Sequence, residues 1–238
     1  MKLAYDLHIH SALSPCAEDD MTPNNIVNMS LIKGLDIIAV TDHNSAKNVK
    51  SVMQAAKGKD IIIVPGIEVN TREDIHVLCY FDSLENALKF DEWLYEKLIV
   101  IPFDKNKFGN QLIIDQNDEV IGFEEKFLHQ GADAGLDEII KAADQMGGIA
   151  VPAHINRDAN SILNILGFIP ENKLITAVEL SKFLKMPIND LSNYHMLYSS
   201  DAHSLGLILE RDSFIDLEEK NSKNLIKYLK NEKNKKSI

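Results

Sequence analysis

Residues 22–44 read TPNNIVNMSLIKGLDIIAVTDHN, and this stretch decides the fold. Its opening Thr-Pro pair is typical of a helix N-terminus, and Gly34 is typical of a helix end. The apolar run over residues 36–40 predicts a short buried strand. Four polar residues, Thr-Asp-His-Asn, follow this strand at 41–44. A helix that leads into a strand with a polar corner at its end is the repeating unit of an α/β fold.

The same alternation of apolar runs and amphipathic stretches continues on both sides. A helix is expected over residues 84–98 and a hairpin over 111–123, which makes segment 82–136 an insertion in the pattern. No composition break divides the chain, so one α/β domain is expected over residues 1–238. The other predicted strands are 2–10, 61–64, 76–81, 149–152, 177–180, 196–199 and 214–217, and the other predicted helices are 49–56, 137–146 and 221–231.

The composition is that of a globular protein, because 45% of the 238 residues are hydrophobic and 26% are charged. Lys and Arg number 25 against 36 Asp and Glu, so the formal net charge is −11. An acidic surface repels phosphate backbones, and stable nucleic-acid binding is therefore not expected. A small phosphorylated substrate is compatible with this charge, because bound divalent cations reverse its sign locally.

Two cysteines, Cys16 and Cys79, are too few for a disulfide framework. The N-terminus reaches Asp6 and His8 before a long apolar stretch develops, so no signal peptide is expected. The apolar runs have the length of strands and are too short to span a bilayer. A cytoplasmic protein without a membrane partner is therefore expected, and its oligomeric state stays open.

Histidines and acidic residues lie in or just after the predicted strands. Each alone has an ordinary explanation, such as a turn, a helix cap or a hydrogen-bonded core histidine. Together they predict one common site, because the C-terminal ends of the strands of a parallel barrel meet at one rim. Imidazoles and carboxylates suit Zn, Fe or Mn, and two or three divalent ions bridged by Glu68 or Asp201 are expected. The residues concerned are His8, His10, His43, His76, His154 and His203, with Asp6, Asp42, Glu68 and Asp201.

Four motifs in this order resemble those of the PHP family, the polymerase-and-histidinol-phosphatase metal-dependent phosphoesterases. They are Asp6-Leu7-His8-Ile9-His10-Ser11, Thr41-Asp42-His43-Asn44, Glu68 with His76, and Ser200-Asp201-Ala202-His203, with His154 as an additional histidine. The resemblance runs from residue 3 to about residue 210. It implies a distorted (β/α)7 TIM-like barrel that carries the helix-plus-hairpin segment as an insertion.

The resemblance also implies how three ions would be held. The first set is His8, His10, Glu68 and Asp201; the second is Glu68, His76 and His154; the third includes His43 and His203. Asp42 is expected to orient an imidazole rather than to bind an ion. The third site departs from the family pattern, because the loop after His10 offers Cys16 or Glu18 where members carry a histidine or an aspartate. Cys16 is the predicted ligand, and a plain buried thiol is the alternative.

The resemblance implies hydrolysis of a small phosphomonoester, such as a nucleotide or a nucleoside bisphosphate, by metal-activated water. Asp201 and His203 are expected to serve catalysis as well as metal binding. Arg157 is the candidate phosphate clamp, with Lys182 as a weaker second candidate and an exposed loop arginine as the alternative. The alternative functions are a histidinol-phosphate phosphatase, an exonuclease and a non-catalytic metal-binding module.

Overall fold

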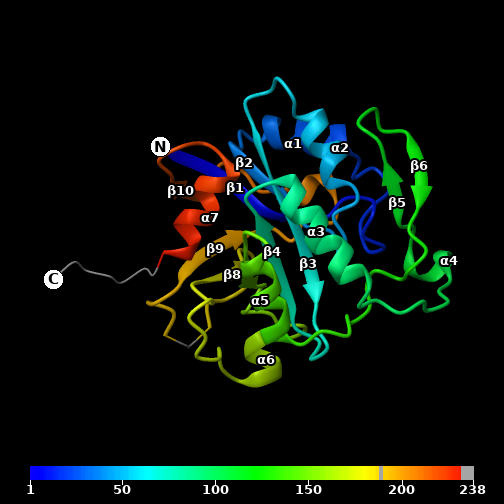
Figure 1. The fold of residues 1–238 in the computed structure, drawn as a ribbon. Coiled ribbons are helices and arrows are strands. Elements are labelled where there is room, and N and C mark those ends of the chain that lie inside the picture. Colours follow the sequence, from blue (N-terminus) through cyan, green and yellow to red (C-terminus); the bar gives the residue numbers. More distant parts are fainter. Residues whose placement is uncertain (188–189, 232–238) are drawn as a thin grey trace.

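The structure is a computed structural model that describes residues 1–187 and 190–231. A six-stranded mixed sheet forms its centre, with the strand order β10-β1-β2-β3-β4-β7. Figure 1 shows α7 on one side of this sheet, and α4 with the β5–β6 hairpin on the opposite side. The six strands are β1 (Lys2–Ile9), β2 (Ile37–Val40), β3 (Ile62–Asn70), β4 (His76–Phe81), β7 (Gly148–Pro152) and β10 (Phe214–Asp216).

β8 (Ala177–Ser181) and β9 (His195–Ser199) form a separate parallel pair, which lies between β7 and β1 of the central sheet. Ile155, just after β7, donates its backbone N–H to Glu179 of β8, and His10, just after β1, donates to Ala202 beyond β9. The sheet is therefore curled, with β8 and β9 filling the space between β7 and β1.

The curled sheet confirms the predicted α/β class, but the distorted (β/α)7 barrel that the family resemblance implies is not confirmed. Strands β1, β2 and β3 run parallel, but β3–β4 and β4–β7 are antiparallel pairs. The reason is the short link between β3 and β4, in which the backbone N–H of Thr71 donates to Ile75 in a tight turn. A turn of this length leaves no room for the crossover helix that a parallel partner strand would need.

Most helices lie near the predicted ranges, but the short helices α4 and α6 were not predicted. α1 begins at the predicted proline, and α3 buries Ala87, Phe90 and Leu94 in the largest apolar cluster of the core. α3 therefore belongs to the core, and the more exposed part of segment 82–136 comes after it. The helices are α1 (Pro23–Ile32), α2 (Val49–Ala55), α3 (Leu84–Tyr95), α4 (Lys105–Phe108), α5 (Leu136–Gln145), α6 (Ile162–Leu166) and α7 (Ser222–Lys230), with a 3-10 turn at Leu205–Leu207.

The predicted hairpin is formed by β5 (Leu112–Ile114) and β6 (Val120–Phe123), and it packs beside the loop that follows β1. The backbone N–H of Leu112 donates to the carbonyl of Ala12. Just before β5, Gly109 has a φ of +89°, and a Cβ there would lie 1.9 Å from the carbonyl oxygen of Pro15. Only glycine lets these two backbones approach so closely.

The structure also bears on the prediction about membranes. Among the helices of residues 1–187 and 190–231, none combines the length and the apolar character that crossing a bilayer requires.

Candidate metal centre

The predicted ligands converge at one end of the curled sheet. His8 lies in β1, His43 follows β2 and Glu68 lies near the end of β3. His76 is the first residue of β4, whereas the parallel-barrel argument expects ligands at C-terminal strand ends. Because β4 runs antiparallel to β3, its first residue faces the same rim. The remaining predicted ligands follow other strands: His10 after β1, His154 after β7, and Asp201 and His203 after β9.

Glu68 is the centre of this cluster. Its carboxylate is buried, and five imidazole nitrogens lie within 3.0–3.4 Å of its two oxygens. Those nitrogens belong to His8, His10, His43, His76 and His154. A carboxylate surrounded in this way has the position that a bridge between neighbouring ions requires.

Asp201 approaches the same histidines from the loop after β9. Its Oδ1 is 3.1 Å from Nε2 of His10 and 3.3 Å from Nε2 of His8, and its Oδ2 accepts a 2.8 Å hydrogen bond from Arg157. Asp201 and His154 have φ values of +55° and +28°. Non-glycine residues rarely adopt this backbone region, and where they do, a functional constraint is often the reason.

The side chains form four overlapping groups in which the ligand atoms lie within 4.8 Å of one another. The first two groups match the first two ligand sets that the family resemblance implies, and the third joins His43 and His203 to His10. The fourth includes a residue that the sequence argument missed, His129. The groups are His8–His10–Glu68–Asp201, Glu68–His76–His154, His10–His43–His203 and His43–His76–His129.

The chemistry of this donor set fits divalent ions. Nε2 of His8 is 3.2 Å from Nε2 of His10, and Nδ1 of His76 is 3.3 Å from Nε2 of His154, so ring nitrogens face each other in pairs. Oε2 of Glu68 and Nε2 of His76 are buried and have no hydrogen-bond partner within the described residues. Buried polar atoms without partners are costly, and coordination of a cation would satisfy them.

Burial opposes charge on Glu68, His10 and His203, and their neighbours decide which of these three groups ionise. Burial raises the pKa of Glu68, but His76, His8 and His43 outweigh it and hold that pKa well below its usual value. Burial also opposes the protonation of His10, yet hydrogen bonds to Asp201 and Glu68 raise its pKa to about 9. Burial dominates for His203 and lowers its pKa to about 4. Positive charge therefore belongs beside the carboxylates, and a divalent ion would supply it in place of protons.

Three buried acids hold the ligands in place. Asp42 accepts from the hydroxyl of Ser14 at 2.7 Å, and that hydroxyl lies 2.9 Å from Nδ1 of His10, so Asp42 acts on an imidazole through a serine. Asp6 accepts a 2.6 Å hydrogen bond from the hydroxyl of Ser200, the residue before Asp201.

The third acid, Glu179 in β8, accepts a short hydrogen bond from the backbone N–H of His154 and lies 3.7 Å from Nδ1 of His8. The sequence argument did not single out Glu179. Its signal was present, because it is a carboxylate inside an apolar strand, as Glu68 is. His129 offered no such signal, because it lies in a loop outside every strand.

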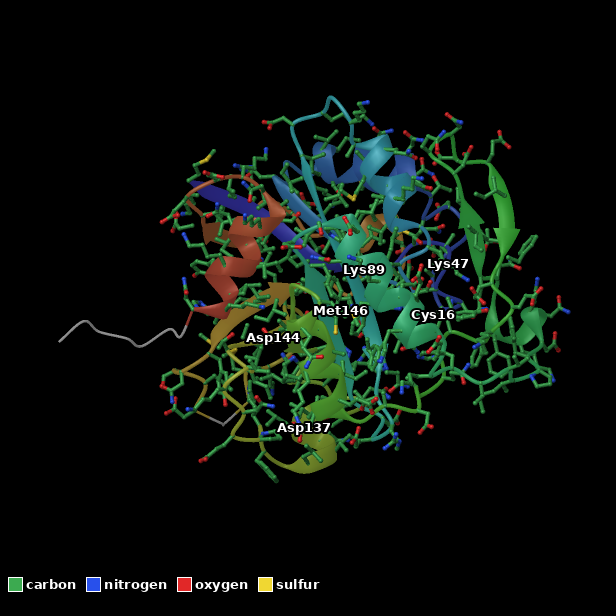
Figure 2. The ribbon with its side chains drawn as sticks, viewed as in Figure 1. Cys16, Lys47, Lys89, Asp137, Asp144 and Met146 are labelled. Carbon is green, nitrogen blue, oxygen red and sulfur yellow. The ribbon has the colours of Figure 1, made fainter. Side chains whose placement is uncertain are left out.

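The residues predicted for the third site and for the phosphate clamp differ in whether they line the cavity. Cys16, in the loop after β1 (Figure 2), lines the cavity but falls in none of the ligand groups found in the described part of the chain. Burial is the main cause that raises the pKa of its thiol to about 12, and the charges of Glu68 and Asp201 add to this effect. Arg157 lines the cavity and is 46% exposed. Lys182 forms an ion pair with Asp212 and is not among the described residues that line the cavity.

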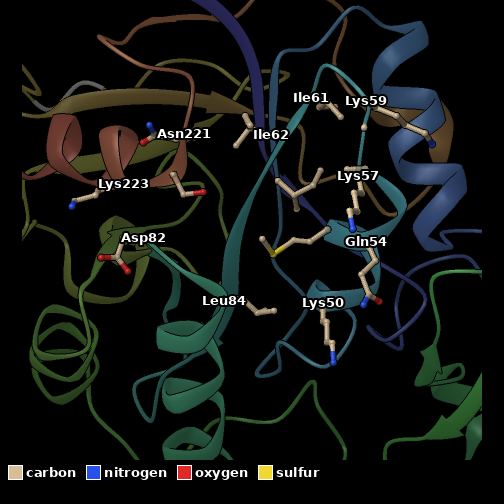
Figure 3. Close-up of a pocket in the computed structure, with 15 residues that line it drawn as sticks. Lys50, Gln54, Lys57, Lys59, Ile61, Ile62, Asp82, Leu84, Asn221 and Lys223 are labelled. Carbon is tan, nitrogen blue, oxygen red and sulfur yellow. The ribbon is translucent and has the colours of Figure 1, made fainter.

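The cavity over the cluster has a volume of about 210 Å³. A larger cavity of about 600 Å³ lies elsewhere, between α2, the start of β3 and the start of α7 (Figure 3). Its described lining includes lysines and isoleucines but no histidine. The metal-ligating side chains therefore belong to the smaller cavity, which is lined by Cys16, His43, Glu68, His76, His129, Arg157, Ala159, Asn160, Asp201 and His203.

Comparison with known proteins agrees with this geometry. A family model described as "PHP domain" matches residues 6–185. Among curated proteins, a 5'-3' exoribonuclease of Haemophilus influenzae is 28% identical over 81 residues, and an uncharacterised protein of Streptococcus pneumoniae is 31% identical over 75 residues. These alignments cover 33% and 28% of this chain, and 28% and 29% of those proteins, respectively. The chain thus spans less than a third of the length of either relative.

Two solved structures share the fold over most of the chain. The lesion-specific Endonuclease Q of Pyrococcus furiosus superimposes with a TM-score of 0.70 at 20% identity, over 97% of this chain and 56% of that one. A phosphoesterase described as metal-dependent, from Bifidobacterium adolescentis, superimposes with a TM-score of 0.58 at 18% identity, over 89% of this chain and 92% of that one.

One prediction from the sequence is overturned by these comparisons. The net charge argued against nucleic-acid binding, but Endonuclease Q has also been solved with a 27-mer duplex that carries an abasic lesion at its active site, and that structure superimposes with a TM-score of 0.68. A net charge averages over the whole surface, whereas the field at a site is set by nearby ions and side chains. The charge of −11 therefore does not exclude nucleic acid as a substrate.

Proposed function

Because the chain belongs to the PHP domain family, we propose that it is a metal-dependent phosphoesterase that hydrolyses a terminal phosphoester of a nucleotide or a nucleoside bisphosphate. The similar phosphoesterase and endonuclease structures support a hydrolase that acts on phosphoester bonds. The observation that carries the proposal is the position of Glu68, with five imidazole nitrogens within 3.4 Å of its carboxylate in a cavity of about 210 Å³.

Two or three divalent ions, chosen among Zn, Fe and Mn, suit this mixture of nitrogen and oxygen donors. When bound, such ions acidify a water molecule and neutralise charge on a phosphoryl group. The proposed ligands are His8, His10, Glu68 and Asp201 for one ion, Glu68, His76 and His154 for a second, and His43 and His203 within a third set.

The protein's own side chains supply orientation and charge. Asp201 holds His8 and His10 on one side through Oδ1 and Arg157 on the other through Oδ2. Arg157 uses one nitrogen for this ion pair, and its partly exposed guanidinium retains other N–H groups that can donate to a phosphoryl oxygen. His203 lines the same cavity, and its low pKa keeps the imidazole neutral and able to coordinate an ion.

The size of the cavity favours a substrate that inserts only its phosphate. Pockets that enclose drug-sized molecules usually have volumes of about 300 Å³ or more, so about 210 Å³ suits a phosphoryl group with part of its sugar. The remainder of the substrate would lie outside, beside the segment that follows α3. A nuclease that acts on a nucleic-acid end or lesion is therefore the second candidate function, and the likeness to Endonuclease Q favours it.

A panel of substrates tests the proposal. The purified protein would be loaded with Zn, Fe or Mn, and phosphate release measured from nucleoside monophosphates, nucleoside bisphosphates and histidinol phosphate. Cleavage of 5'-phosphorylated oligonucleotides and of an abasic duplex would be followed in parallel. We expect the fastest turnover with a mononucleotide substrate and none with Glu68→Gln. Faster cleavage of oligonucleotides would select the nuclease, and no turnover with any metal would leave a non-catalytic metal-binding module.

A further inference from the structure

His129 reaches the metal cluster from the insertion, far from the loop that was expected to complete the third site. Its ring centroid is 4.5 Å from that of His43 and 6.2 Å from that of His76. One ligand nitrogen from each of these three histidines lies within 4.8 Å of the other two. His129 also lines the cavity, so its side chain faces the same space as the predicted ligands.

The backbone on both sides of His129 is held by the residue that follows His43. The side-chain amide of Asn44 donates two buried hydrogen bonds of 2.8 Å, one to the carbonyl of Leu128 and one to the carbonyl of Gln130. The Oδ1 atom of Asn44 accepts from the backbone N–H of Asn70, at the end of β3. Asn44 has a φ of +48°, a conformation that asparagine tolerates better than most residues. One side chain thus joins the ends of β2 and β3 to the loop that carries His129.

A second set of hydrogen bonds closes the loop around His129. The side-chain amide of Gln130 donates to the carbonyls of Phe127, at 2.7 Å, and Ile99, at 2.9 Å. The backbone N–H of Ala132 donates to the carbonyl of Asn70 at 2.8 Å. The end of β3 and the loop that carries His129 are therefore tied together, although Asn70 and Ala132 are 62 residues apart in the sequence.

We propose that His129 is a metal ligand that binds an ion together with His43, in the place for which the sequence suggests Cys16 or Glu18. His76 is the third histidine within reach, and its buried Nε2 has no other partner among the described residues. Imidazole nitrogens are common ligands of zinc and of other divalent ions. The proposal rests on the proposed function, and it adds that the insertion is part of the metal centre.

The competing residues are less well placed. Cys16 lines the cavity but belongs to none of the ligand groups found among the described residues. Glu18 is not among the described residues that line the cavity. His129, by contrast, falls in one ligand group with His43 and His76.

The test compares metal content among single variants of the full chain. His129→Gln removes the imidazole from an exposed loop position, and His195→Gln is the matched control, because His195 hydrogen-bonds the carbonyl of Asn231 away from the cluster. Proteins would be equilibrated with Zn and dialysed, and bound metal counted by elemental analysis. We expect His129→Gln to retain one equivalent fewer than wild type, and His195→Gln and Cys16→Ser to retain the wild-type number.

Amide hydrogen exchange supplies an independent measurement. We expect metal to slow exchange at residues 127–132 in the wild-type protein and not in His129→Gln. Asn44→Ala should weaken the binding of the same ion by about tenfold or more, because it removes the two hydrogen bonds that hold the backbone on both sides of His129. If His129→Gln keeps its full metal content while Cys16→Ser or Glu18→Gln loses one equivalent, the proposal fails and the loop supplies the ligand. If the wild-type protein itself binds no metal, both this proposal and the proposed function fail.

Discussion

The candidate metal centre combines proposed ligands within strands with the proposed ligand His129, which lies in a loop, and these are held differently. His8, Glu68 and His76 lie within β1, β3 and β4, are at most 4% exposed, and cannot move without breaking sheet hydrogen bonds. His129 is exposed and is held by the hydrogen bonds of Asn44 to its two neighbours. The proposed ligands within strands are therefore preorganised, whereas the side chain of His129 can be removed without disturbing the core.

The largest effect is expected at the strand-borne centre. Glu68→Gln removes the one negative charge that several imidazoles share, so we expect the loss of bound metal and a fall in kcat of at least about 1,000-fold, equivalent to about 4 kcal/mol. Elemental analysis and steady-state kinetics would measure both. The exposed Glu125→Gln serves as the control and should match wild type. Full metal content with full turnover in Glu68→Gln would remove Glu68 from its bridging position.

Arg157 is a loop residue that is not a proposed ligand, and it pairs with the proposed ligand Asp201. We expect Arg157→Ala to lower kcat and kcat/KM by about 30- to 1,000-fold, because a bidentate charged contact contributes about 2–4 kcal/mol. Arg157→Lys should recover part of the rate, and both variants should keep their metal. A loss of metal in Arg157→Ala would instead show that it positions Asp201, and a change below about threefold would exclude it from the site. Arg72→Ala, at an exposed ion pair, is the control.

A substitution of Glu179 tests how far the proposed ligands depend on the buried acids that contact them. Glu179→Gln weakens the acceptor of the His154 backbone N–H and removes the charge beside His8. We expect metal affinity to fall by about 10- to 100-fold, as is typical of residues that orient metal ligands. Titration against a chelating dye would measure this affinity.

Glu124→Gln is a matched comparison for Glu179→Gln, because Glu124 is also a buried acid but pairs with Lys47 away from the cluster. It should lower the melting temperature and leave metal affinity unchanged. Equal metal affinities in the two variants would show that the strands alone orient the ligands.

The smallest effect is expected in the hairpin of the insertion. Shortening it between residues 112 and 122, at its turn over 115–119, removes part of the segment that packs beside the loop after β1 and leaves His129 in place. We expect relative rates across the substrate panel to change by about threefold to tenfold, because loops beside a site often shape its specificity. Metal content should stay constant. Unchanged relative rates would assign the hairpin to packing or assembly.

The local elements of the fold could be predicted from the sequence because they depend on near neighbours. The apolar run of β2, the helix start at Pro23 and the turn of the β5–β6 hairpin each have a local signature. The direction of β4 was not predicted, although its cause is also local. Whether a strand pairs parallel or antiparallel depends on the link before it, and a five-residue turn between β3 and β4 decided against a barrel of repeated units.

The ligands could be predicted wherever a charged or imidazole side chain interrupts an apolar strand, as Glu68 does, because a buried charge without a partner is too costly to be accidental. His129 lies in a loop whose sequence looks like any other polar connection. Its position depends on Asn44, which is 85 residues away along the chain and adjacent only after folding. By itself the sequence determined most of the elements and most of the residues that gather in the cluster. The direction of β4 followed from the short link before it, whereas the approach of His129 was decided by contacts between distant segments, which no local pattern encodes.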